Sequence, residues 1–198
     1  MINVTYHQIK AIMDGKGYKW FTKPYDLNLI GIRNPSPRPD KFDDTLVVAY
    51  LDSMGNPRTF VCPITTDPGL YYLQNPMNPS GTAILYPGQY LGLWKLGKHQ
   101  GKYTALVQQK PAKVIRDANK DSILDFYHQK TETGIQGINL HRAIEDWIST
   151  VVGKWSAGCQ VIPVAADFNY IISLVKLQIR HIKSDIVSYT LLMESEIQ

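Results

Sequence analysis

His141 and Cys159 are the residues of this chain whose types and spacing best fit covalent catalysis. A cysteine attacks as its thiolate, and a neighbouring imidazole can take the thiol proton and return it later in the reaction. Cys159 ends the short run Ser156-Ala157-Gly158-Cys159. A small residue and a glycine before the cysteine let consecutive main-chain N–H groups converge where an oxyanion would form. The segment therefore predicts a nucleophile, a base and an oxyanion hole made by the amides of the last three residues of this run.

Other interpretations of these residues stay open. Cys159 can be a small buried hydrophobic residue, or it can form a disulfide with Cys62, the only other cysteine. Ser156 can hydrogen-bond within the turn or to the histidine, or it can simply support the loop. His141 and Glu145 have a spacing that suits two metal ligands, but no second histidine lies in the segment. Chain order excludes papain-like peptidases, because in those enzymes the cysteine precedes the histidine.

A second segment, residues 117–125, has the ligand spacing of a calcium-binding loop. Oxygen ligands fall at positions 1, 3, 5, 7 and 9 of such a loop: Asp117, Asn119, Asp121, Ile123 (through its main-chain oxygen) and Asp125. Ser122 stands at position 6 instead of glycine, and His128 stands at position 12 instead of a bidentate glutamate. The segment predicts either a structural Ca²⁺ site or a hydrophilic hairpin loop, and the proposed chemistry requires no other cofactor.

The composition is that of a soluble globular protein of one domain, residues 1–198. Hydrophobic residues make up 44% of the chain and charged residues 19%, and the net charge is +4. No run of basic residues is present, so we expect no nucleic-acid partner. The first residues lack a basic segment followed by an apolar one, and no stretch approaches the roughly 20 apolar residues of a membrane span. We therefore expect a protein that is made in the cytoplasm without a signal peptide and has no membrane span.

The hydrophobic pattern predicts a predominantly β protein of the α+β class with a helix near each end. Thr5 and Gln8 form a capping-box pattern ahead of an apolar face, which predicts the N-terminal helix. From Phe168 to Ile186 apolar residues recur at steps of four and three, which predicts a long C-terminal helix. Loops with short strands are expected between residues 63 and 87. Other strands are predicted at 46–51, 58–62, 103–109, 112–116, 137–141, 158–162 and 189–193.

The segment from His141 to Cys159 resembles the signature of the L,D-transpeptidase catalytic domain family. In that signature a histidine is followed, after a spacer, by Ser or Thr, His, Gly and Cys; here residues 142–155 form the spacer before residues 156–159. The strand that leads to the histidine, residues 137–141, also looks like that of the family. Some phage and prophage proteins share the variant Trp-Ser-Ala-Gly-Cys-Gln, which is present here as residues 155–160. The resemblance covers roughly residues 80–165.

The resemblance implies a mixed β-sandwich or barrel as the fold, and acyl transfer on peptidoglycan stem peptides as the activity. In the family a main-chain carbonyl just after the histidine orients the imidazole, and here that carbonyl would belong to Arg142. Two departures affect donor recognition: Ala157 stands where the family has a histidine, and Val161 replaces a polar residue.

With no export signal, these departures favour hydrolysis by a lysin-like L,D-peptidase that acts on the cell wall after release. Two alternatives remain: a transpeptidase that forms cross-links, and a non-catalytic virion or wall-binding module on the same fold.

Overall fold

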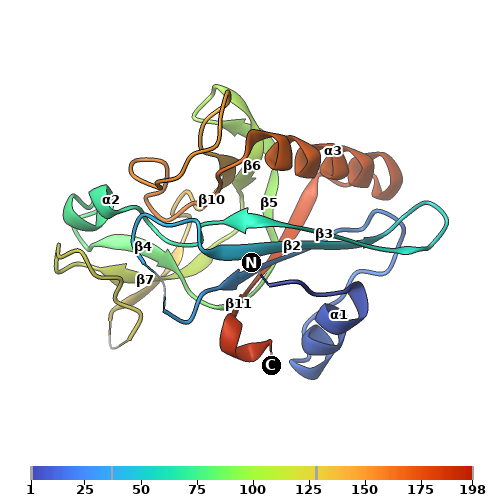
Figure 1. Ribbon diagram of the computed structural model, residues 1–198, viewed down its shortest axis with the longest axis horizontal. Helices are drawn as coiled ribbons and strands as arrows, with labels where there is room; N and C mark the ends of the chain where they lie inside the picture. The colour runs from blue at the N-terminus through green and yellow to red at the C-terminus, as the bar shows by residue number, and fades with distance from the viewer. Residues whose placement is uncertain (1, 37, 128, 198) are drawn as a thin grey trace.

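The computed structural model of the protein describes residues 2–36, 38–127 and 129–197 (Figure 1). These residues form a mostly β structure built on two sheets, in agreement with the fold class predicted from the sequence. In spatial order, the strands of the main sheet are β10 (Gln160–Ile162), β9 (Leu140–Arg142), β6 (Tyr103–Gln108), β5 (Gly88–His99), β11 (Ile186–Met193), β1 (Asn28–Arg33), β2 (Asp44–Leu51) and β3 (Pro57–Ile64). The smaller sheet consists of β4 (Thr82–Leu85), β7 (Ala112–Asp117) and β8 (Thr131–Gly134).

The two edges of the main sheet meet just beyond β3, so the sheet is nearly closed into a barrel. Thr65, the residue after β3, pairs with Val161 of β10: each N–H donates to the other residue's main-chain oxygen, at 2.9 and 3.0 Å. The sheet is mixed, because β1 runs parallel to β11 and β9 runs parallel to β10. Closure satisfies main-chain groups that an open edge would leave unpaired.

The described residues also form three α-helices: α1 (Tyr6–Gly15), α2 (Leu70–Gln74) and α3 (Ala165–Ile182). A short 3₁₀ turn, η1 (Glu194–Glu196), follows β11. Figure 1 shows α1 and α3 on opposite sides of the β2–β3 hairpin. Alternate residues of β2 account for this arrangement. Leu46 and Val48 belong to the main core together with Phe168 of α3, whereas Val47 packs with Ile9 of α1. Both faces of β2 are therefore buried.

The N-terminal helix begins where the capping box predicts. The Thr5 hydroxyl accepts from the N–H of Gln8 at 3.3 Å, and the Gln8 side chain accepts from the N–H of Thr5 at 2.9 Å. These bonds satisfy N–H groups that the first turn of a helix leaves free. Ile9 and Met13 are buried on the face that packs against β1 and β2. The prediction for this helix is confirmed.

The C-terminal helix is shorter than the apolar stripe predicts. It ends at Ile182, because Lys183 adopts a left-handed conformation with φ of 61° and its N–H bonds to the Ile179 oxygen. Ile186, which the stripe assigns to the helix, instead opens β11 and is 39% exposed. Its position in phase with the helical repeat is a coincidence of spacing, so extending the helix to Ile186 was wrong.

Several elements were not predicted from the sequence. All six residues of β1 are buried, so the strand has no alternation between polar and apolar residues. Strand β5 contains three glycines, which weaken the strand pattern. The five-residue helix α2 lies in the region expected to hold loops and short strands, and β8 was not foreseen either. Within the described ranges, no helix combines the length and the apolar character needed to cross a bilayer.

The interior of the near-barrel fixes the position of β10. Tyr189 of β11 is fully buried and donates from its hydroxyl to the Gln160 side-chain oxygen at 2.7 Å, although β10 and β11 are not neighbours in the sheet. The ring passes so close to β1 that a Cβ at Gly31 would lie 1.8 Å from the Tyr189 hydroxyl. Glycine is therefore required at that position. This cross-barrel bond anchors the strand that immediately follows Cys159.

Candidate active site

The imidazole of His141, in β9, is oriented by a main-chain carbonyl. Its Nδ1 lies 2.8 Å from the main-chain oxygen of Arg142, the carbonyl that the resemblance implies. A carbonyl oxygen can only accept, so Nδ1 carries the proton and Nε2 keeps its lone pair. The side chain is 2% exposed, and Nε2 has no hydrogen-bond partner among the residues that the structure describes. The ring is thus set to act as a base through Nε2.

Cys159 lies immediately before β10 and is half-buried. Its Sγ is 3.3 Å from the main-chain oxygen of Gly137, to which the thiol can donate. The other cysteine, Cys62, is buried, and both are free thiols. The disulfide considered as an alternative is therefore not formed.

The pairing of β9 with β10 brings the segments of the two candidate catalytic residues side by side. His141 lies opposite Val161, and the N–H of Gln160 donates to the Asn139 oxygen at 2.8 Å. Cys159 comes immediately before β10, so this bond holds it beside the end of the strand that carries His141. The thiol is turned toward Gly137, and no hydrogen bond joins it to the imidazole in the described part of the chain.

Both candidate groups are uncharged at neutral pH. The pKa of His141 is lowered to about 4, chiefly by burial and also by the charge of nearby His99, while the main-chain oxygens of Arg142 and Trp155 act in the opposite direction. Burial also raises the pKa of the Cys159 thiol to about 11, against a lowering effect of the Asn139 main chain. A preformed thiolate–imidazolium pair is therefore disfavoured. In this arrangement, proton transfer to Nε2 has to accompany nucleophilic attack.

Ser156 stabilises the turn that carries the cysteine. Its hydroxyl donates to the main-chain oxygen of Cys159 at 2.8 Å and accepts from the N–H of Gly158 at 3.1 Å. Its own main-chain oxygen accepts from the N–H of Gly69 at 2.9 Å. Of the roles considered for Ser156, the hydrogen bond within the turn is the one that is formed. Its side chain is fully buried, so these bonds are shielded from water.

Gly158 allows the turn to pass close to β4. It has φ of +120°, and a Cβ at this position would lie 2.4 Å from the main-chain oxygen of Ala83. Its N–H is used by Ser156, which differs from its expected role as an oxyanion donor. The N–H groups of Ala157 and Cys159 make no hydrogen bond within the described residues, so these two remain available to an oxyanion.

Two hollows flank the segment that leads to Cys159. Trp155 lines a cleft of about 490 Å³ that also contains His141, and Ala157 lines a smaller hollow of about 150 Å³ beside β4. A larger hollow of about 680 Å³ is lined by residues such as Phe42 and Ile148 but by neither candidate catalytic residue. Cys159 is not among the residues that line either of the two smaller hollows, but both are lined by residues of the segment that leads to it.

Two residues around the imidazole were not identified from the sequence. His99 stacks on His141 with 3.9 Å between ring centroids and an interplanar angle of 21°. The Tyr103 hydroxyl donates to the Arg142 oxygen at 3.1 Å and lies 3.3 Å from Nδ1 of His141. His99 and Tyr103 pair across the tight β5–β6 hairpin. Only the register of that hairpin, which turns at the glycine two residues after His99, could have indicated that both face β9.

The tautomer of His99 follows from its neighbours. The Asn139 side-chain oxygen accepts from the N–H of Gln108 at 2.8 Å, so its amide nitrogen is the group that lies 3.3 Å from Nδ1 of His99. Nδ1 of His99 therefore accepts, and Nε2 carries the proton. Burial lowers the pKa of His99, and the charge of Lys102 lowers it further. A neutral His99 thus presents a single N–H donor at Nε2.

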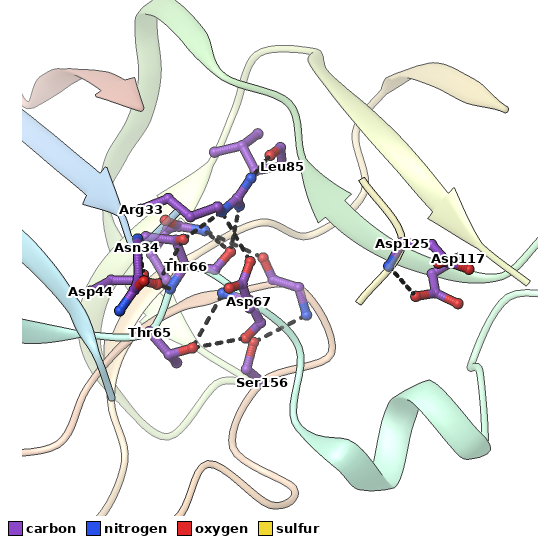
Figure 2. A network of polar contacts seen from close by, with 12 residues as sticks. Arg33, Asn34, Asp44, Thr65, Thr66, Asp67, Leu85, Asp117, Asp125 and Ser156 are labelled. Carbon is purple, nitrogen blue, oxygen red and sulfur yellow. Dashed lines mark hydrogen bonds and ion pairs between the residues drawn. The ribbon is translucent and has the colours of Figure 1, made fainter. Parts of the chain in front are cut away.

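A buried polar network supports the segment to which the turn is bonded (Figure 2). The Arg33 side chain donates to the main-chain oxygens of Thr66 and Leu85, at 2.9 and 3.0 Å, and its Nε lies 3.0 Å from a carboxylate oxygen of Asp67. Asp44 accepts from the N–H and the hydroxyl of Thr66, at 2.7 and 2.8 Å. The four residues of this network whose side chains are polar are nearly inaccessible to water: Arg33, Asp44, Thr66 and Asp67. The network fixes the chain that runs from β3 toward α2, which bonds to the main-chain oxygen of Ser156 through the N–H of Gly69.

One arginine compensates two carboxylates in this network. Burial raises the pKa of Asp67 to about 7, Arg33 lowers it, and the charge of Asp44 raises it again. Burial also raises the pKa of Asp44, against the lowering effects of Arg33 and of the bonds from Asn34 and Thr66. At neutral pH a fraction of the protein molecules therefore carries a proton in this cluster, chiefly on Asp67.

The predicted calcium segment forms a hydrogen-bonded loop between β7 and β8. The Asp125 N–H donates to Asp117 at 3.1 Å (Figure 2), and the Asn119 amide donates to Asp121 and Asp125 at 2.9 and 2.7 Å. The N–H of Ile123 donates to Asp121 at 2.7 Å. The carboxylates are thus held by protein donors, as expected of the hydrophilic-loop interpretation.

One atom of this loop lacks a partner. Oδ1 of Asp117 is buried with no hydrogen bond, and burial raises the pKa of Asp117 to about 6, with Asp125 and Asp121 adding to the rise through their charges. No group of three His, Cys, Asp or Glu side chains is gathered for a metal ion in the described residues, and His128 lies outside them. Ca²⁺ binding at this loop stays a prediction.

The chain matches no protein-family model, no curated protein and no solved structure. The function of the site therefore has to be inferred from its own geometry and from the short motif that carries His141 and Cys159.

Proposed function

We propose that the protein is a cysteine-dependent acyl-transfer enzyme that acts on peptidoglycan stem peptides. The observation that carries the proposal is the buried Nε2 of His141, which is unprotonated, has no partner among the described residues and belongs to the strand paired with β10, the strand that Cys159 immediately precedes. The substrate class is supported by the resemblance of residues 141–159 to the L,D-transpeptidase signature. In this proposal the protein acts on the cell wall after release from the cell that makes it.

The reaction begins with attack of Cys159 on the carbonyl carbon at an L-to-D peptide junction. The S–C bond forms as the thiol turns from the Gly137 oxygen and gives its proton to Nε2 of His141. The free N–H groups of Ala157 and Cys159 stabilise the oxyanion, a contribution that is typically worth about 100- to 1,000-fold in rate. The C–N bond then breaks, and the imidazolium protonates the departing amine. A thioester remains on the enzyme.

The second step decides between two products. If water attacks the thioester, a carboxylic acid is released and the thiol is regenerated; if an amine attacks, a new peptide bond forms. We favour hydrolysis, because Ala157 and Val161 lack the polar side chains with which the resembling family recognises its donor. A transpeptidase that forms cross-links is the alternative on the same chemistry.

A non-catalytic wall-binding or virion module is a second candidate function. It is favoured by the orientation of the thiol, which bonds to Gly137 instead of to the imidazole, and by the raised pKa of Cys159, about 11, that results from burial. A thiol with such a pKa is a poor nucleophile without a base. Reactivity of the free protein therefore separates the two candidates.

The test is mass spectrometry of muropeptides released from sacculi by the full-length protein, compared with Cys159→Ala and with Cys62→Ala as the matched cysteine control. We expect wild type and Cys62→Ala to shorten stem peptides and Cys159→Ala to leave them intact. Adding an amine acceptor to purified stem peptides distinguishes the products, since only a transpeptidase incorporates it. Identical muropeptides from folded wild type and Cys159→Ala would refute the enzymatic proposal.

A further inference from the structure

The cleft beside His141 has an excess of positive charge. Its walls are the β5–β6 hairpin, the chain that follows β9 and the segment before the Ser156 turn. Three basic side chains line it, Lys102, Arg142 and Lys154, and one acidic side chain, Glu145. Arg142 pairs with Glu145 at 2.8 Å, so their charges cancel. The two lysines are left as an excess of two positive charges on a cleft of about 490 Å³.

Neither lysine has an acidic partner in the described part of the chain. Lys154 is exposed, and its ammonium lies 4.1 Å from the centre of the Tyr71 ring, which orients the side chain but leaves N–H groups free. Lys102 is also exposed and lines the cleft from the β5–β6 hairpin, which also carries His99, the residue whose pKa the charge of Lys102 lowers. The two lysines therefore line the cleft from different segments, the β5–β6 hairpin and the segment before the Ser156 turn.

His99 adds an uncharged donor to the cleft, and His141 places a base in it. The N–H of His99 at Nε2 is a donor, since its Nδ1 is held by Asn139. Nε2 of His141, which is buried without a partner among the described residues, is an acceptor and so does not hold the anion, but it places the base beside this site. Cationic donors on two walls next to a base fit a peptide that carries a carboxylate close to its reacting bond.

We propose that this cleft binds a free carboxylate of the peptide substrate through Lys102 and Lys154, and so selects acidic peptides over their carboxamide forms. The inference rests on the proposed function, because that function supplies a peptide at this position. Neither lysine touches the reacting atoms, so each determines specificity and not catalysis. The carboxylate would also neutralise the cleft and favour the imidazolium that forms on His141 during attack.

The test uses two synthetic stem peptides that differ only in one side chain, a free carboxylate in one and its carboxamide in the other. Binding to the full-length Cys159→Ala protein is measured by calorimetry, and turnover is measured with the wild-type thiol. We expect Lys102→Gln and Lys154→Gln each to weaken binding of the carboxylate peptide about three- to fivefold, as for partly exposed ion pairs. Binding of the carboxamide peptide should not change. Lys98→Gln is the matched control, because Lys98 is exposed on β5 but does not line the cleft.

The outcomes separate this inference from the proposed function. Equal binding of the two peptides, or a loss of affinity in Lys98→Gln as large as in the two cleft variants, would overturn the inference even if turnover is observed. Carboxylate-dependent binding that is lost in Lys102→Gln and Lys154→Gln, in a protein without turnover, would uphold the cleft as a carboxylate site and overturn the enzymatic proposal. Raised salt should reduce the preference for the carboxylate peptide, because the lysines are exposed.

Discussion

Substitution of Asp67 by asparagine should change how the stability of the protein depends on pH. In the folded protein Asp67 and Asp44 share a single arginine, Arg33, in a region without access to water. Ionisation of both carboxylates leaves one buried negative charge without compensation, which is costly in a medium of low polarity. Asp67→Asn removes that charge and keeps a side chain of nearly the same shape. The pair of Arg33 and Asp44 then stays balanced at all pH values above the acidic range.

The size of the effect follows from the pKa of Asp67, which burial raises from 3.8 to about 7. Because the folded-state pKa lies above the unfolded value, the contribution of Asp67 to stability is fully present below about pH 4 and is lost as pH rises through 7. The linkage relation then gives a loss of about 3 kcal/mol of wild-type stability between pH 5 and pH 8 from this group alone. Asp67→Asn should lack this loss.

The assay is urea unfolding at pH 5, 6, 7 and 8, followed by tryptophan fluorescence, for wild type and Asp67→Asn. The difference in the free energy of unfolding, variant minus wild type, should increase by about 3 kcal/mol from pH 5 to pH 8. Asp146→Asn, at an exposed carboxylate, is the control and should run parallel to wild type. Parallel curves for Asp67→Asn and wild type would refute the reasoning, since they would mean that Asp67 is ionised in the folded state throughout.

Three further predictions concern the site. Replacement of His99 by leucine removes a ring that lowers the pKa of His141. The acidic limb of kcat/KM is set by protonation of this imidazole, whose pKa is about 4, and it should move to higher pH in His99→Leu. A limb at the wild-type pH would contradict this role. Gly158→Ala should destabilise the protein by about 2 kcal/mol or more and reduce activity, because a Cβ there would lie 2.4 Å from the Ala83 oxygen at a φ that favours glycine. A melting temperature of Gly158→Ala equal to that of wild type would contradict this prediction. Ser156→Ala leaves the N–H of Gly158 and the Cys159 oxygen without their buried partner. We expect the free energy of unfolding in urea to fall by about 1–3 kcal/mol, and labelling or turnover at Cys159 to become slower. Ser149→Ala, on the exposed loop, is the control and should change neither.

The parts of the fold that the sequence predicts are those that depend on neighbours along the chain. The capping box at Thr5 involves residues three apart, and it defines the start of α1 correctly. The hairpin of β2 and β3 is likewise apparent from a local turn between two β-rich runs. In contrast, β1 owes its burial to α1 on one face and to the barrel interior on the other, and a uniformly buried strand has no alternating pattern to detect. Its existence depends on contacts that are distant in the sequence.

The candidate site was predictable to the same extent. The order and spacing of His141 and Cys159, and the carbonyl of Arg142 as the partner of the imidazole, follow from a short motif. The stacked ring of His99 depends on how the β5–β6 hairpin lies against β9, which no local pattern reveals. The use of the Gly158 N–H by Ser156 also became clear only from the conformation of the turn.

The bridge between Thr65 and Val161 has a consequence for how the protein would fail under stress. Strands β9 and β10 are only three residues long, and they form the place where the sheet closes on itself. Short terminal pairings open at a lower free energy than the strands at the middle of a sheet. Heat or denaturant should therefore separate β9 and β10, next to Cys159, from their neighbours while most of the sheet is intact, so the proposed activity would be lost before the bulk of the structure unfolds.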